Sequence, residues 1–93
     1  MTVRLLPEAI DDIDAAYAWL FERAPSAAER MRRDIGRALA LLDGLELGRV
    51  ATLTDGREVR RWPIGTMVIY YRRRGDVLEV LRVFDARRAP IEG

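Results

Sequence analysis

The chain has 93 residues, which corresponds to one domain spanning residues 1–93. With 49 % hydrophobic and 33 % charged residues the composition is that of a globular protein rather than a disordered one. No apolar run reaches the roughly 18 residues that a membrane span needs, residues 1–6 lack the apolar core of a signal peptide, and the absence of cysteine excludes disulfide bonds and thiolate metal sites. A net charge of +1 indicates no particular partner, and we expect a cytoplasmic protein without membrane contact.

The chain opens with a short strand and an amphipathic helix. Thr2–Leu6 is a strand candidate, and Pro7 fits the first turn of a helix, where its missing N–H group costs nothing. Apolar residues then recur at helical spacing over about residues 7–23. They are Ile10, Ile13, Tyr17 and Leu20. The acidic run Asp11, Asp12 and Asp14 is no metal-binding motif, and we interpret it as the solvated start of this helix.

A second helix follows directly. Pro25 is expected to end the first helix, and Ser26 with Glu29 has the S-x-x-E spacing of a capping box. The apolar stripe of the new helix is Ala28, Met31, Ile35, Leu39 and Leu42. Gly44 is a natural stop. Two helices joined by so short a break predict an antiparallel hairpin.

The rest of the chain is typical of strands. Leu45–Gly56 shows no period and is expected to be a loop. Three runs rich in β-branched and aromatic residues follow at Val59–Ile64, Thr66–Arg73 and Val77–Phe84, separated by turn residues. The fold class is therefore α+β: an N-terminal strand, then a two-helix antiparallel hairpin packed on one face of a small antiparallel sheet that ends in a three-stranded meander.

Arginine is concentrated in the second half of the chain. Residues 1–46 carry six arginines against nine acidic residues, a net charge of −3, and residues 47–93 carry ten against six, a net charge of +4. All sixteen basic residues are arginines. Between residues 57 and 74 six arginines meet a single acid, and Trp62, Tyr70 and Tyr71 are interleaved with them.

Strand alternation assigns these residues to faces of the sheet. Val68, Tyr70 and Arg72 should share one face of the middle strand, and Met67, Ile69, Tyr71 and Arg73 the other. In the last strand Leu78, Val80, Arg82 and Phe84 should oppose Val77, Glu79, Leu81 and Val83. The face without helices should then show arginines among aromatic residues. Such a face can bind phosphates and stack on bases, can seat an acidic amphipathic protein, or can be an ordinary solvated surface.

Motifs for catalysis are scarce. The chain contains no histidine, the commonest acid–base group, and no glycine-rich loop that could cradle a phosphate. Neither a cofactor nor a metal is expected. A nuclease without histidine would have to combine arginine electrostatics with a tyrosine as acid or base.

Four stretches, in order and at family spacing, resemble the ParE/RelE superfamily of type II toxin–antitoxin toxins, in particular its ParE-like plasmid stabilisation branch. Leu5–Ile13 (LLPEAIDDI) is similar to an L-S-P-E-A-x-x-D-L opening, although Leu6 stands where the family has its serine cap. Pro25–Arg30 resembles the start of the second helix. Val59–Arg72 (VRRWPIGTMVIYYR) resembles an R-x-x-P-V-G-x-Y-V-I-x-Y-R core, and Val80–Arg88 an I-L-R-V-x-H-x-x-R tail.

The resemblance implies a bacterial toxin that inhibits growth and is neutralised by a cognate antitoxin. ParE-like members poison DNA gyrase, whereas RelE-like members cut mRNA on the ribosome. The tail of this chain lacks the usual histidine, and no tyrosine follows Tyr71, which favours the ParE-like, non-enzymatic function. The alternatives are an mRNA endonuclease and a non-toxic family member that only binds its antitoxin.

The resemblance also implies site residues. For contacts to the target or the antitoxin they are Arg60, Arg61, Trp62, Tyr70, Arg72, Arg82, Arg87 and Arg88. For a nuclease the candidates are Arg61, Arg72, Arg82, Tyr70 and Asp85. The arginines can act together only if they converge in space.

Overall fold

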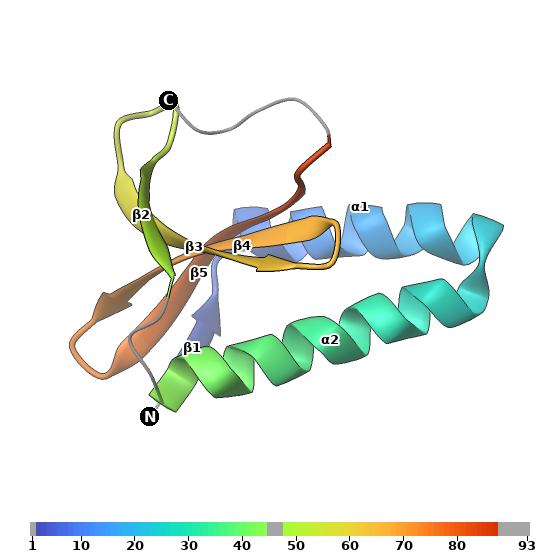
Figure 1. The fold of residues 1–93 in the computed structure, drawn as a ribbon, viewed down its shortest axis with the longest axis horizontal. Coiled ribbons are helices and arrows are strands. Elements are labelled where there is room, and N and C mark those ends of the chain that lie inside the picture. The colour runs from blue at the N-terminus through green and yellow to red at the C-terminus, as the bar shows by residue number, and fades with distance from the viewer. Residues whose placement is uncertain (1, 45–47, 88–93) are drawn as a thin grey trace.

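The structure, a computed structural model, describes residues 2–44 and 48–87. A helix hairpin lies against one twisted sheet, and the hairpin extends well beyond the sheet at one end (Figure 1). In chain order the elements are β1 (Thr2–Leu5), α1 (Pro7–Arg23), α2 (Pro25–Gly44), β2 (Arg49–Thr52), β3 (Glu58–Ile64), β4 (Met67–Arg74) and β5 (Val77–Asp85). The expected α+β architecture with its hairpin and meander is confirmed.

The sheet has five strands in the order β1-β5-β4-β3-β2. The first strand pairs parallel with the last one, with Thr2 opposite Val77, and the other neighbours are antiparallel. The sheet is therefore mixed and not purely antiparallel as expected. Pro63 is tolerated in β3 because β2 pairs only with the residues up to Arg61, so the ladder on that side has ended before the proline.

The expected loop at Leu45–Gly56 was partly wrong, because β2 occupies Arg49–Thr52. This strand is only four residues long and lies at the edge of the sheet, and its Val50 side chain is exposed. Because Ala51 is the one partly buried residue of β2, the strand is too short to show an apolar alternation in the sequence. Leu45 to Leu47 lie outside the described residues. The turn over Thr54–Gly56 is present as expected.

The break between the helices also differs from the expectation. Ala24 alone joins them: its N–H group donates to the carbonyl oxygen of Leu20, and its own carbonyl oxygen accepts from the N–H groups of Ala27 and Ala28. As expected, α1 ends ahead of Pro25, at Arg23, and Pro25 is also the first residue of α2. The prediction of a capping box at Ser26 and Glu29 was wrong, because the helix starts before Ser26. The Glu29 carboxylate instead accepts a hydrogen bond from the Tyr17 hydroxyl on α1.

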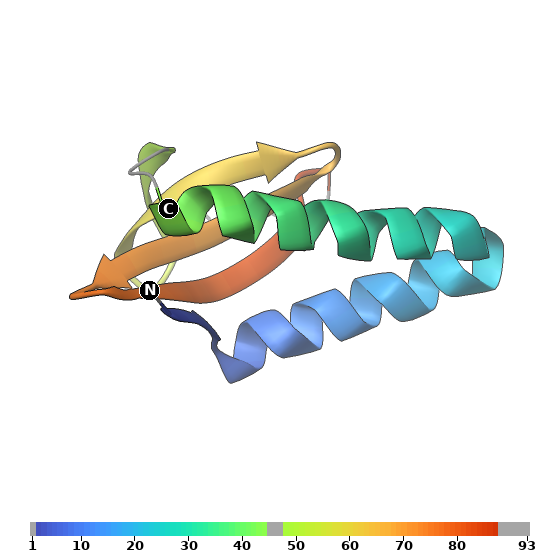
Figure 2. The same cartoon turned by 90° about the horizontal axis from the view of Figure 1, so that it is seen from below.

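Both helices pack on the same face of the sheet (Figure 2). Met31, Ile35 and Leu42 of α2 lie in one buried cluster with sheet residues such as Ile69 and Leu78. Tyr71 and, partly buried, Trp62 belong to the same cluster. A second, smaller cluster lies on the opposite face of the sheet, which is called the open face below. Its buried members are Leu53, Val59, Val68, Tyr70 and Leu81.

A β-bulge changes the pattern of β5. Tyr70 pairs with Arg82 and Tyr71 with Val80, so Leu81 is an extra residue in the ladder. The alternation expected for β4 is confirmed, but that of β5 holds only up to the bulge. Beyond it Val83 joins the helix side and Phe84 the open face, the reverse of the expected sides, because one inserted residue exchanges every later side chain. Among residues 2–44 and 48–87, no helix is long and apolar enough to cross a membrane.

Candidate binding surfaces

The open face of the sheet carries arginines from four strands. The β2–β3 register places Arg49 opposite Arg61, and Arg61 lies opposite Tyr70. Two residues after Tyr70 in β4, Arg72 lies opposite Glu79 of β5. On the other side of β5, Arg4 of β1 also pairs with Glu79. Of the aromatic residues that were expected between these arginines, Tyr70 is only 5 % exposed. The ring of Tyr70 therefore contributes little to this surface, where Phe84 is partly buried.

Glu79 is the acidic centre of this surface. The Arg72 Nε group donates to its Oε1 at 2.9 Å, and Arg74 Nη1 lies 3.8 Å from the same oxygen. The hydrogen bond from Arg72 holds the pKa of Glu79 below its ordinary value against the opposing effect of desolvation, and the charges of Arg72, Arg74 and Arg4 lower it further. Glu79 is therefore ionised at neutral pH although the residue is only 5 % exposed.

This ion pair predicts a stability loss in acid. A carboxylate whose pKa is lowered by folding contributes stability that is fully present above its unfolded pKa of about 4.3 and is lost as the pH falls through the folded value. Unfolding by urea at a series of pH values should therefore show the wild type losing stability below about pH 4. The Glu79→Gln variant should lose less over the same range. Parallel curves for the two proteins would contradict a contribution from Glu79.

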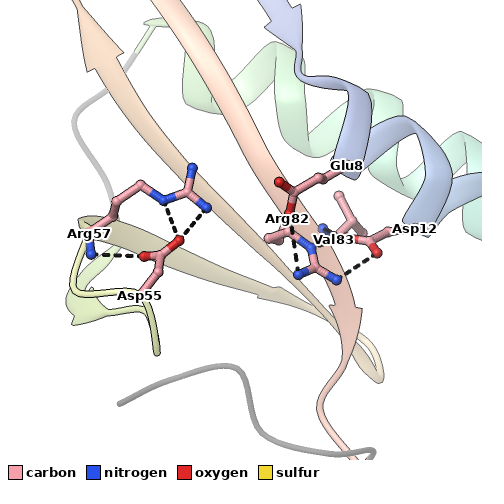
Figure 3. A network of polar contacts seen from close by, with 6 residues as sticks. All are labelled: Glu8, Asp12, Asp55, Arg57, Arg82 and Val83. Carbon is pink, nitrogen blue, oxygen red and sulfur yellow. Dashed lines mark hydrogen bonds and ion pairs between the residues drawn. The ribbon is translucent and has the colours of Figure 1, made fainter.

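Arg82 is bound by two acidic residues of α1, Asp12 and Glu8 (Figure 3). Its Nε and Nη2 groups donate to the two carboxylate oxygens of Asp12 at 2.7 and 2.9 Å, and the backbone N–H of Val83 donates to Asp12 at 3.0 Å. Glu8 adds an ion pair at 3.6 Å. The hydrogen bonds that Arg82 donates to Asp12 raise the pKa of Arg82 although burial opposes the charge. The interpretation of Asp12 as a solvated residue was therefore wrong.

The other expected site residues do not converge. Arg60 lies opposite Tyr71, hence on the helix side, and its Nη1 group donates to the Gly48 carbonyl oxygen at 3.0 Å. Trp62, opposite Ile69, packs against the helix-side cluster. Arg61, Arg72 and Arg82 have strand positions on the open face, since Arg82 pairs with Tyr70, but the Arg82 side chain binds Asp12 of α1. A common site of Arg60, Arg61, Arg72 and Arg82 is therefore not formed.

Asp85 and Arg87 form a local pair at the end of β5. The Asp85 carboxylate accepts hydrogen bonds from the backbone N–H, Nε and Nη2 of Arg87, at 2.9, 3.1 and 3.0 Å. The hydrogen bond and charge of Asp85 raise the pKa of Arg87. Arg88 lies outside the described residues. Within the described parts of the chain, no three acidic, histidine or cysteine side chains are grouped so that they could hold a metal ion.

A groove lies between the helix hairpin and the end of the meander. Its volume is about 390 Å3, and it is bounded by α1, α2, the turn between β3 and β4, and the end of β5. Apolar groups form much of its wall: Ala16, Trp19, Leu20, Met31, Ile64 and Phe84. Charged groups line it as well: Asp12, Asp34, Asp85, Arg30 and Arg87. Trp19 is 43 % exposed there, which is unusual for so large an apolar side chain.

Several important residues escaped the sequence analysis. Arg73, expected only as a surface residue on one side of β4, donates from Nη2 to the carbonyl oxygens of Leu42 and Asp43 and so caps the end of α2. Nothing local in the sequence marks this contact. Glu79 did have a signal, because the short turn after Arg74 fixes the β4–β5 register and sets Arg72 opposite Glu79.

The comparisons with known proteins agree with this architecture. A family model described as the ParE toxin of the type II toxin–antitoxin system parDE matches residues 3–90. Among solved structures the chain is similar to one described as the chromosomal ParDE TA system from P. aeruginosa, with a TM-score of 0.75 and 21 % identity, over 91 % of this chain and 95 % of that chain. At this identity the likeness shows the fold alone. No curated protein matches the chain.

Proposed function

The chain belongs to the ParE toxin family of type II toxin–antitoxin systems, and on this premise we propose that it arrests growth by poisoning DNA gyrase in the cytoplasm. Residues 1–93 act as a single toxin domain without a cofactor, and a cognate antitoxin neutralises it. The alternative to gyrase poisoning that is tested below is the cleavage of mRNA on the ribosome.

The observation that carries this choice is that two of the three arginines proposed for a nuclease are already paired with carboxylates. Arg82 is neutralised by Asp12 and Glu8, and Arg72 donates its Nε group to Glu79. A guanidinium already paired with a carboxylate stabilises additional negative charge on a scissile phosphate less well than one free to bind it. This supports a toxin that acts by binding rather than by cleaving a phosphodiester.

The acid–base candidates support the same conclusion. Cleavage of RNA by its 2′-hydroxyl is a transesterification that needs one group to remove the proton of the attacking hydroxyl and one to protonate the leaving 5′-oxygen, both within hydrogen-bond reach. Tyr70 is 5 % exposed beneath the open face, and Asp85 is occupied by Arg87. The chain has no histidine to replace them. A gyrase poison requires no such groups, only a surface of suitable shape and charge.

The groove beside the helix hairpin is the proposed seat of the antitoxin. It combines apolar walls with charges of both signs, which suits an amphipathic segment with hydrophobic anchors and a polar rim. The exposed Trp19 is of the residue type that contributes most to protein interfaces. The open face, where Val59, Val68 and Leu81 are buried, offers such a segment less apolar contact.

The purified protein should inhibit DNA supercoiling by gyrase, or trap cleaved DNA, while mRNA on translating ribosomes stays intact. Losing a positioned acid or base typically slows a reaction by about 10²–10⁴-fold, so mRNA cleavage should be very slow or absent. Supercoiling assays on agarose gels and primer extension on a reporter mRNA measure the two activities side by side. Addition of the cognate antitoxin should restore supercoiling.

Matched variants separate the two mechanisms further. Tyr70→Phe and Asp85→Asn remove the acid–base candidates with little change of shape, so both should retain the inhibition of gyrase. Codon-specific mRNA cuts that these variants abolish, with normal supercoiling, would establish the nuclease instead. Neither activity in a protein that still binds its antitoxin would identify a non-toxic family member.

A further inference from the structure

The open face carries an excess of positive charge around one buried carboxylate. Arg4, Arg72 and Arg74, from β1 and β4, all act on Glu79. Three guanidinium groups thus share one negative charge, which leaves a local charge of about +2. Arg49 and Arg61 of the neighbouring strands extend the same face. Across this part of the described structure Glu79 is the only acid whose strand position places it among these arginines.

The Glu79 carboxylate is more deeply buried than the guanidinium groups around it. The Glu79 side chain is 7 % exposed, whereas those of Arg72 and Arg74 are 33 % and 67 % exposed. Arg4 is exposed as well. Glu79 therefore lies beneath the arginines and orients Arg72 through its Nε group, while the outer guanidinium surfaces meet solvent. The arrangement presents hydrogen-bond donors outward on a rigid sheet.

We propose that this arginine cluster, centred on Arg4, Arg72 and Arg74, binds the phosphate backbone of duplex DNA. Arg4 and Arg72 lie on strands separated by β5, so their backbones are about 10 Å apart, and Arg61 and Arg49 continue the positive face onto β3 and β2. A spread of this kind matches a polyanion with several phosphates better than a single small anion. The guanidinium fork is suited to phosphate oxygens.

Duplex DNA is favoured over a single strand by the position of the aromatic rings. Binding of single strands relies on exposed aromatic side chains on which bases stack. Tyr70 is buried on this face, Phe84 is partly buried with the Arg82 guanidinium 5.5 Å from its ring centroid, and Tyr71 and Trp62 belong to the helix-side cluster. An acidic protein segment is disfavoured for a related reason, since Val59, Val68 and Leu81 are all buried and leave little apolar surface for it. The proposal goes beyond gyrase poisoning, because it requires contact with DNA in the absence of gyrase.

Fluorescence anisotropy of a short labelled DNA duplex, titrated with the protein over a series of salt concentrations, tests the proposal. The double variant Arg4→Gln/Arg74→Gln removes two contacts, so the slope of log K against log salt should flatten by about 1.8. At about 0.1 M salt the Kd should rise by roughly one to two orders of magnitude. Arg33→Gln/Arg37→Gln, with the same charge change on exposed positions of α2, is the matched control and should bind like the wild type.

A lysine variant and two competing polyanions complete the experiment. Arg4→Lys/Arg74→Lys should retain most of the binding, because an ammonium group also pairs with phosphate as a point charge, and this rescue excludes a folding defect. The proposal is overturned if the wild type does not bind duplex DNA at low salt or if both glutamine pairs weaken binding equally. Preferential binding of single-stranded RNA or of polyglutamate would also overturn it. Because no gyrase is present, the result stands apart from that of the supercoiling assay.

Discussion

Replacing Asp12 with alanine is expected to lower the free energy of unfolding by about 2–3 kcal/mol. The Asp12 carboxylate accepts two hydrogen bonds from Arg82 and one from the backbone N–H of Val83. Its side chain is 13 % exposed and that of Arg82 is 25 % exposed, so water can replace these partners only in part. The variant leaves a partly buried guanidinium facing only Glu8, at 3.6 Å.

The neighbouring Asp11 provides the control. It lies on the same helix but is exposed, and Asp11→Ala should change stability by less than about 0.5 kcal/mol. Urea unfolding followed by circular dichroism measures both variants. A double variant that also carries Arg82→Ala should lose less than the sum of the single losses, because the two residues act as one pair. Equal stability of the two aspartate variants would show that the pair does not secure α1 to β5.

Among substitutions that add a single methyl group, Gly48→Ala is expected to lower the free energy of unfolding most. Its φ angle of +96° lies in the left-handed region, and an added Cβ would come within 2.5 Å of the Tyr71 hydroxyl oxygen and 2.7 Å of the Arg61 carbonyl oxygen. The second contact is with backbone, which cannot move away without disturbing β3. Gly48→Ala should therefore lower the free energy of unfolding by about 3–4 kcal/mol, the sum of backbone strain and overpacking.

Gly56 separates these two contributions. Its φ angle of +90° is nearly the same, but an added Cβ would meet nothing within 4 Å. Gly56→Ala should therefore show the backbone contribution alone, about 1 kcal/mol. Thermal and urea unfolding of the two variants give the comparison. If Gly56→Ala costs as much as Gly48→Ala, the close approach to Tyr71 and Arg61 is not what requires a glycine at position 48.

The elements that could be predicted from the sequence are those with several periods of apolar residues. The stripes of α1 and α2 and the alternation of β4 are of this kind. The strand β2 could not be predicted, because its Val50 is exposed and its four residues contain no complete pattern. The bulge at Leu81 was equally hidden, since one extra residue changes the pairing without changing the composition of the strand.

The candidate sites were harder to predict than the fold. The concentration of arginine was visible, but the partner of each arginine depends on tertiary contacts. Arg82 and Asp12 are 70 residues apart, and no local feature of either links them. The groove, too, depends on how far the helices extend past the sheet, which periodicity does not specify (Figure 1).

The parallel pairing of β1 with β5 has a consequence for the order of events during synthesis. Thr2 finds its partner only when Val77 has been made, and at about 5–20 residues per second this takes roughly 4–15 s after Thr2 is joined. The high sequence separation makes this pairing an entropically costly, late step of folding. Arg82 is made later still. Before β5 has been translated, a nascent chain therefore lacks both the β1–β5 pairing and the ion pair between Arg82 and Asp12 of α1. A ribosome that makes this protein therefore carries an incompletely folded form of it until β5 is available for pairing.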